Sequence, residues 1–187
     1  IPDHILADGQ DSIRARLKRP EVRKEVIASI QNRLKKRGLK HLNYAVVAYF
    51  DADTTYNGKS IEEINLMKGR KHKTKYEAET VMDIQMAGGA SAVFHGMGES
   101  DVQRIMKYPF NMIASDATIR VFNEGMPHPR GYGTNARVLG KYVREEKIIS
   151  LEEAIRRMSS LPAQKFNLKD RGLLKEGMAA DIVVFDE

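Results

Sequence analysis

The sequence predicts an α/β protein in which short strands alternate with helices. Apolar runs such as 44–50, rich in β-branched and aromatic residues, have the length of buried strands. Charged segments with apolar residues at helical spacing lie between these runs. The order strand, helix, strand, loop, helix is typical of the βα units of a parallel sheet. Residues 89–170 therefore resemble the closing βα units of a larger barrel or sheet.

The composition favours a folded protein over a disordered one. A chain of 187 residues, of which 42% are hydrophobic, is long enough for one good core or for two small units. Because cysteine is absent, disulfides and thiolate metal sites are excluded. The longest nearly continuous apolar run, 44–50, is too short to span a bilayer, and there is no signal-peptide pattern. We therefore expect a soluble, cytoplasmic protein that does not enter a membrane.

The first part of the chain predicts charged helices around one strand. A short helix is expected over 11–18. A longer helix should begin at Pro20 and end at Gly38, because proline favours the first turn and glycine the residue after the end. In this helix an apolar residue recurs every four positions: Val22, Val26, Ile30 and Leu34. Residues 44–50 are the buried strand that follows.

Capping-box motifs predict four further helix starts. They are Ser60-x-x-Glu63, Thr74-x-x-Glu77, Ser100-x-x-Gln103 and Ser150-x-x-Glu153. The second of these helices is expected to end at Gly88-Gly89 and the fourth near Pro162. Short strands are expected over 90–94 and 112–115, before and after the third helix.

The rest of the chain predicts a loop, a helix and a change to β structure. The loop 117–132 should lead to a helix over 134–146. Two short apolar segments, 172–174 and 182–185, flank a turn and predict a β-hairpin. The chain opens on Ile1-Pro2 and closes on an apolar strand without a partner, so we expect a piece of a longer polypeptide. An open strand edge of this kind should also favour self-association or low stability.

The formal charge of +6 raises the question of a polyanion partner. Part of the excess lies in Lys68–Lys75, a run without any acidic residue. A basic patch of this kind can bind nucleic acid. The alternative, which we favour, is a solvated loop between two helices, because no aromatic residue is present in the run to stack on bases. We therefore expect no nucleic-acid partner.

A carboxylate at the end of a predicted strand is the first candidate for chemistry. The strand 112–115 runs into Asp116, and a Gly/Pro-rich loop then presents His128 and Arg130. Enzymes of the α/β class place reactive groups at the carboxyl ends of strands. A carboxylate there can ligate a metal, or take a proton from water and pass it to a leaving group. It can equally be an Asx-turn residue that starts the loop.

The motifs around Asp116 resemble those of the N-acyl-D-amino-acid deacylases, or D-aminoacylases, of the amidohydrolase superfamily. The matching segments are Phe94–Val102 with Arg104-Ile-Met and Tyr108-Pro109, Met112–Asp116, His128–Thr134 with Val138–Gly140 and Tyr142, Leu161–Ala163, and Gly172–Phe185. Ser-Asp followed by His-Pro-Arg is the part most specific to deacylases. The resemblance is good over 90–187 and looser over 1–88.

The resemblance implies a fold and its division into parts. Residues 89–170 would be the last βα units of a TIM-type (β/α)8 barrel with its catalytic strand. Residues 1–88 would be a charged α/β insert of that barrel, and 171–187 the first strands of a C-terminal β-sandwich. The chain would thus hold an incomplete domain.

The resemblance also implies a zinc-dependent hydrolase that converts N-acyl-D-amino acids to a carboxylate and a free D-amino acid. Asp116 would activate the attacking water and share in metal binding. Arg130 would hold the substrate α-carboxylate, which suits the fork of a guanidinium. His95 follows a predicted strand and could line the same pocket, whereas His128, between two prolines, is expected to be loop scaffolding.

The ligands of a catalytic zinc ion are not apparent in the sequence. Such a site needs three protein ligands and an open position. The histidines at 4, 41, 72, 95 and 128 form no His-x-His or His-x-x-x-His motif. We therefore expect zinc in the full-length enzyme but not in this chain alone, and no activity from the isolated chain.

Two alternatives remain open at this point. Within the superfamily, a dihydroorotase- or hydantoinase-like cyclic amidohydrolase would share much of the tail motif. In a different class, the chain would be a basic interaction module without catalysis, and its binding would depend on Lys71, Lys73 and Lys75 and on salt.

Overall fold

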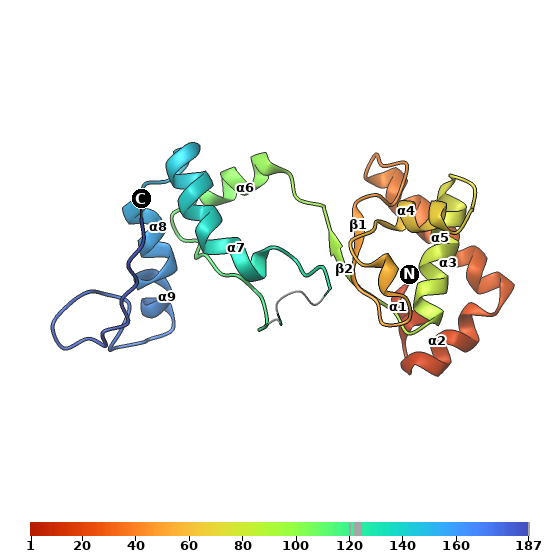
Figure 1. Ribbon diagram of the computed structural model, residues 1–187, viewed down its shortest axis with the longest axis horizontal. Helices are drawn as coiled ribbons and strands as arrows, with labels where there is room; N and C mark the ends of the chain where they lie inside the picture. The colour runs from red at the N-terminus through yellow and green to blue at the C-terminus, as the bar shows by residue number, and fades with distance from the viewer. Residues whose placement is uncertain (120, 122–124, 187) are drawn as a thin grey trace. The chain divides into compact units, whose positions relative to one another are not determined.

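The computed structural model of the chain describes residues 1–119, 121 and 125–186. The chain divides into two compact units (Figure 1). The first comprises Ile1–Gly96 and Val121–His128, and the second Met97–Arg120 and Pro129–Glu187. Among the described residues, no helix combines the length and the apolar character that a membrane crossing requires.

Charged helices surround the core of the first unit, as predicted. They are α1 (Asp3–Leu6), α2 (Gly9–Leu17), α3 (Pro20–Lys36), α4 (Ile61–Met67) and α5 (Thr74–Met86). The apolar face of α3 is buried at Val26, Ile30 and Leu34 and packs in one cluster with residues of α2 and α5. The left-handed Gly38, with φ of +65°, ends this helix as expected, and Leu39 N–H donates to Leu34 O at 3.0 Å.

Both strands predicted in this unit form, but their pairing differs from the prediction. β1 (Ala45–Tyr49) and β2 (Ser91–Phe94) pair antiparallel, with Ala45 opposite Phe94 and Val47 opposite Ala92. The expected parallel arrangement is therefore wrong for this pair. β2 is largely exposed, which an antiparallel ladder tolerates and a parallel sheet, usually covered on both faces, does not.

A returning segment of the chain lies against the irregular part of β1. The register shifts between Val47 and Tyr49, so Ala48 is left out of the pairing with β2. Met126 N–H donates to the Ala48 carbonyl oxygen at 2.7 Å. Gly125 has φ of +62°, and a Cβ atom there would lie 2.8 Å from the same oxygen. Only glycine allows this approach.

One predicted capping box is present in this unit and another is not. Ser60 Oγ accepts from Glu63 N–H at 3.2 Å, and Glu63 Oε2 accepts from Ser60 N–H at 2.7 Å, which starts α4 after the short 3-10 helix η1 (Thr54–Tyr56). The box predicted at Thr74 is wrong. The Thr74 hydroxyl donates to Lys40 O at 2.9 Å instead, and Glu77 turns into the interior.

The second unit consists of helices in its regular parts. They are α6 (Glu99–Met106), α7 (Arg130–Arg137), the π-helix η2 (Val138–Glu145), α8 (Leu151–Met158) and α9 (Ser160–Lys165). Its core contains Met106, Val138, Tyr142 and Ala154. The predicted cap of α8 is confirmed, since Ser150 Oγ accepts from Glu153 N–H at 3.3 Å.

A buried arginine connects the elements of this unit. Arg157 is 2% exposed, and its guanidinium donates to the Met106 carbonyl, to Asn111 Oδ1 at 2.5 Å and to Glu153 Oε1 at 2.7 Å. Its own carbonyl oxygen accepts from Ile113 N–H at 3.2 Å. Arg157 therefore fixes residues 106–113 against α8.

The element boundaries in the second unit differ from several predictions. Residues 112–115 are not a strand, because the Ile113 N–H pairs with a helical residue rather than with a neighbouring strand. Helix α6 begins at Glu99 after Gly98, so Ser100 is not its cap, and α7 begins at Arg130 rather than at 134.

The C-terminal part of the unit also departs from the prediction. The helix expected to end near Pro162 is interrupted at Ser159, and α9 continues to Lys165 with Pro162 in its first turn, where a missing N–H costs nothing. The described residues after 170 contain no strand, and Leu174 and Val184 are exposed without an opposing strand. The predicted hairpin is therefore absent from this part of the structure.

The contacts of Glu153 predict how acid affects stability. Hydrogen bonds from Arg156 and then Arg157 lower the pKa of the Glu153 carboxyl from 4.5 to about 2. Because the folded-state pKa lies below the unfolded-state value, this carboxylate stabilises the fold fully above about pH 4.5, and the contribution is lost as the pH falls toward 2.

The stability advantage of the native chain over Glu153→Gln should therefore shrink between about pH 5 and pH 2.5. Urea unfolding of both proteins at several pH values measures it. Glu145→Gln, an exposed change of the same charge, is the control. An advantage that stays constant through this pH range would contradict the assignment.

Candidate functional site

The second unit brings Asp116 and Arg130 together, two of the residues singled out from the sequence. Arg130 Nη2 lies 3.1 Å from Asp116 Oδ2. Both side chains are open to solvent, with exposed fractions of 84% for Asp116 and 47% for Arg130. The pair is thus an accessible carboxylate beside a guanidinium, close enough for both to contact one small molecule.

Local backbone structure positions the two side chains. Asp116 has a φ of +47°, a left-handed conformation that aspartate tolerates better than most residues. Arg130 is the first residue of α7, directly after Pro129. A Cβ atom at Gly131 would lie 3.5 Å from the Cβ of Ala117, so the residue after Asp116 passes close to the first turn of α7. Asn111 and Ile113, a few residues before Asp116, are hydrogen-bonded to Arg157.

The ion pair between Asp116 and Arg130 is weak enough for a ligand to replace one partner. An exposed ion pair contributes on the order of 0–1 kcal/mol, because water screens the attraction and ordering two side chains costs entropy. A guanidinium can hold a carboxylate through two parallel hydrogen bonds. Arg130 can therefore exchange the Asp116 carboxylate for that of a ligand at small cost.

His95 belongs to the first unit. It follows β2, its N–H donates to Tyr44 O at 2.8 Å, and the residue is exposed. The expected contact of His95 with substrate stays a prediction, as do the catalytic roles of Asp116 and Arg130.

A second cluster of ionisable side chains lies within the first unit. His41, Glu62, His72 and Glu77 each have a ligand-type atom within 4.8 Å of those of the other three. His41 Nδ1 lies 2.5 Å from Glu77 Oε1 and 3.8 Å from Glu62 Oε1, and His72 Nε2 lies 2.5 Å from Glu62 Oε1. The two imidazole rings stack with centroids 4.0 Å apart. This is the group of metal-binding type found among the described residues, and Asp116 is not in it.

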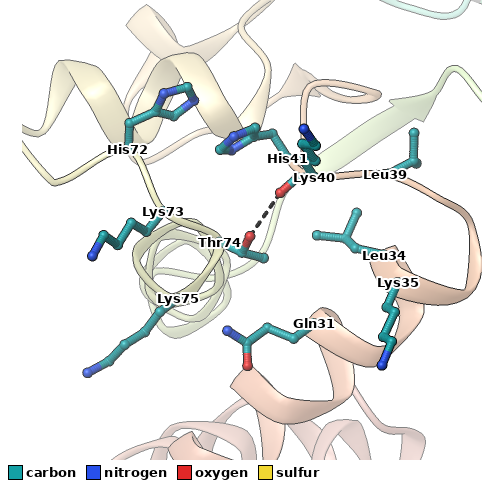
Figure 2. Close-up of a pocket in the computed structure, with 10 residues that line it drawn as sticks. All are labelled: Gln31, Leu34, Lys35, Leu39, Lys40, His41, His72, Lys73, Thr74 and Lys75. Carbon is teal, nitrogen blue, oxygen red and sulfur yellow. Dashed lines mark hydrogen bonds between the residues drawn. The ribbon is translucent and has the colours of Figure 1, made fainter.

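The two histidines line an open depression of about 580 Å³ (Figure 2). The remaining lining comes from α3, the segment after it and the start of α5: Gln31, Leu34, Lys35, Leu39, Lys40, Lys73, Thr74 and Lys75. Glu77, which contacts His41, has 0% of its side chain exposed, and its Oε2 accepts from Leu42 N–H at 2.8 Å.

This cluster could not be predicted from short sequence motifs. Its members come from four separate segments, so no short motif links them. Glu77 was explained as half of a capping box, and His72 as part of a solvated basic run. The sequence offered one signal for this cluster. Helical spacing places Glu77 on the same side of α5 as Ala78 and Met82, and in the structure all three residues are buried.

The basic run Lys68–Lys75 lies largely in the loop between α4 and α5, as the favoured interpretation predicted. Asp83 on α5 pairs with Lys68 at 2.5 Å and with Arg70 at 2.7 Å. Burial opposes ionisation of Asp83, but these hydrogen bonds outweigh it and hold the pKa of the carboxyl below its usual range. Part of the positive charge is therefore neutralised within the unit.

Comparison with known sequences matches this chain to the amidohydrolase family and to deacylases within it. The model of the amidohydrolase family matches residues 7–187. An N-acyl-D-glutamate deacylase from Alcaligenes xylosoxydans xylosoxydans is 45% identical over 97 residues, which are 52% of this chain and 19% of that protein. A D-aminoacylase from the same organism is 40% identical over 130 residues, which are 70% of this chain and 25% of that protein.

Solved structures agree with the sequence matches. The N-acyl-D-glutamate deacylase from Bordetella bronchiseptica, complexed with zinc and a phosphonate inhibitor that mimics the tetrahedral intermediate, superposes with a TM-score of 0.62 at 30% identity. The match covers 75% of this chain and 27% of that one. A dihydroorotase from Lactobacillus acidophilus matches over only 46 residues, or 25% of this chain, at 44% identity. The chain thus spans about a fifth to a quarter of the deacylases' length, and the deacylases match more of it than the dihydroorotase does.

The exposure of the Asp116–Arg130 pair predicts that it contributes little to folding. Asp116→Asn keeps the shape and the tolerance for positive φ, so the free energy of unfolding should change by less than about 0.5 kcal/mol. Arg157→Leu removes the guanidinium and leaves its buried hydrogen-bond partners unpaired, so it should lower the free energy of unfolding by about 3–5 kcal/mol. Urea unfolding compares the two. A large loss in Asp116→Asn would indicate a structural role.

Proposed function

The chain belongs to the amidohydrolase family, and we propose that it is part of a metal-dependent enzyme that hydrolyses N-acyl-D-amino acids to a carboxylate and a free D-amino acid. The observation that carries the proposal is the 3.1 Å approach of Arg130 to Asp116. These are the acid–base group and the carboxylate-binding group that the deacylase-like motifs single out. The 45% identity with an N-acyl-D-glutamate deacylase supports the same substrate class.

We further propose how the chain fits into the whole enzyme. Residues 89–170 would be the last βα units of a (β/α)8 barrel, 1–88 an insert in it, and 171–187 the first strands of a β-sandwich. In that setting 112–115 and the segments after 170 would find the strand partners that the described residues do not supply. The share of the relatives that the chain covers, 19% to 27%, leaves room for the other barrel strands.

The proposed role of Asp116 is proton transfer. An accessible carboxylate can accept a proton from the attacking water, then give it to the nitrogen of the departing D-amino acid. Because 84% of the side chain is exposed, water and substrate can reach both carboxylate oxygens. Transfers of this type contribute a factor of about 10² to 10⁴ in rate.

The proposed role of Arg130 is to bind the α-carboxylate of the substrate. When the substrate carboxylate takes the place of Asp116 on the guanidinium, the Asp116 oxygens are released for proton transfer. Substrate binding and activation of the base are thereby coupled. A lysine could supply the charge but not the two parallel hydrogen bonds.

Among the residues that the structure describes, Asp116 belongs to no group that could hold a metal ion. Asp116 pairs with a guanidinium, which cannot ligate a metal, and the group of metal-binding type found among the described residues does not contain it. We therefore propose that the ligands of the catalytic metal come from barrel strands outside this chain. The carboxylate of Asp116 would complete that set only in the full enzyme.

A chimeric enzyme tests the proposed function. This chain replaces the aligned segment of the Alcaligenes xylosoxydans xylosoxydans D-aminoacylase, and hydrolysis of N-acetyl-D-amino acids is measured with the L-enantiomers as controls. The chimera should act on the D-substrates. Arg130→Lys should raise KM for the D-substrate with a smaller effect on kcat, because it removes a carboxylate contact. The matched control is Arg137→Lys, because Arg137 is another arginine of α7 and forms an exposed ion pair, in its case with Glu99.

The isolated 187-residue chain is the complementary sample. With added zinc and N-acetyl-D-amino acids it should show no turnover. Turnover by the isolated chain would contradict the division of the site proposed above. A chimera that folds and binds zinc but leaves D-substrates intact would contradict the function itself.

A further inference from the structure

We propose that His41, Glu62, His72 and Glu77 form a second metal site, which binds one zinc-like transition-metal dication and has a structural role. The site lies within the first unit and contains neither Asp116 nor Arg130. It does not depend on the proposed function.

The spacing of the ligand atoms suits a four-coordinate ion. Zinc binds histidine nitrogen at about 2.0–2.1 Å and carboxylate oxygen at about 2.0–2.2 Å, so tetrahedral ligands lie about 3.4 Å apart. Three contacts in the cluster bracket this value, at 2.5 Å for His41–Glu77 and His72–Glu62 and 3.8 Å for His41–Glu62, and all four ligand atoms lie within 4.8 Å of one another. Small side-chain rotations can therefore admit an ion at the centre.

The donor set selects the class of metal. Two imidazoles and two carboxylates supply two nitrogen and two oxygen ligands, and their charge of −2 matches a dication. Imidazole favours zinc, cobalt, nickel and copper, whereas magnesium and calcium prefer oxygen-only sites. With four protein ligands and no open position, the site has the composition of a structural centre.

Hydrogen bonds outside the cluster already orient its members. Glu77 Oε2 is held by Leu42 N–H at 2.8 Å, which directs Oε1 toward His41. The Thr74 hydroxyl ties the start of α5 to Lys40, next to His41. Glu62 lies in the first turn of α4, which the Ser60–Glu63 capping box starts. Such outer partners orient ligands and strengthen metal binding.

The depression beside the histidines gives a route from solvent. His72 is 49% exposed at one side of it, whereas Glu77 is fully buried. Lysines in the lining oppose the approach of a cation, but Figure 2 shows the side chains of Lys35, Lys73 and Lys75 pointing away from the two rings. Their repulsion is screened by salt, whereas the carboxylates attract the ion at bonding distance.

A bound ion would add a cross-link among segments that are far apart in the sequence and already share one buried core. His41 lies between α3 and β1, Glu62 in α4, His72 between α4 and α5, and Glu77 in α5. Metal bonds among them would fix the loop Lys68–Lys73 against the rest of the unit. The role is therefore stabilisation of the first unit, through ligands that exist only in its folded state.

Metal titration of the intact 187-residue chain tests the proposal. Zinc added to metal-free protein should bind one ion per chain by calorimetry and raise the melting temperature, and magnesium should do neither. His72→Gln and Glu62→Gln should each weaken zinc binding at least tenfold. Glu77 is left intact, because its substitution would also remove the buried bond to Leu42. His4→Gln, which alters a surface His–Glu pair at 3.0 Å, should change nothing.

A fourth variant separates this site from the catalytic one. Asp116→Asn should bind zinc like the native chain, and cobalt should give the strong visible absorption of a tetrahedral site that His72→Gln reduces. Absence of zinc binding would overturn the proposal, as would binding that His72→Gln and Glu62→Gln leave unchanged. Neither result bears on the deacylase function, because no activity is measured.

Discussion

Each compact unit buries a charged side chain, Glu77 in the first and Arg157 in the second, and the segments around each supply the hydrogen bonds that such burial requires. The free-energy cost of burying a charged group without partners exceeds the whole free energy of unfolding of a typical domain. Glu77 takes a backbone N–H and an imidazole, and Arg157 takes a carbonyl, an amide and a carboxylate. No buried side-chain polar atom of the described residues lacks a partner.

These two anchors explain why the candidate functional groups lie where they do. Arg157 holds Asn111 and Ile113, and this leads the chain to Asp116 in its left-handed conformation beside Arg130. The exposed pair can then remain weakly bound and exchangeable, because a separate network maintains the backbone. In the first unit the same principle places His41 on Glu77, and His72 and Glu62 complete a cluster around it.

Local patterns predicted much of this structure. The stripe of α3 and the caps at Ser60 and Ser150 follow from interactions within a few residues of each other. The two strands of the first unit were indicated by short apolar runs rich in valine and aromatic residues. Other features depend on partners far away in the sequence, which residue spacing does not reveal. They are the antiparallel pairing of β1 with β2, the absence of a strand over 112–115 and the burial of Glu77. Asp116 and Arg130 were found through a family resemblance, whereas the His41 cluster, spread over four segments, became visible only in three dimensions.

We propose that Asp116 belongs to a metal site completed by residues outside this chain, while the His41 cluster holds an ion of its own. Anomalous diffraction at the zinc edge from crystals of the chimeric enzyme measures both positions at once. We expect a zinc peak at about 2.0–2.2 Å from an Asp116 carboxylate oxygen and a second peak among His41, Glu62, His72 and Glu77. A barrel zinc with Asp116 still paired to Arg130 and out of bonding range would contradict it.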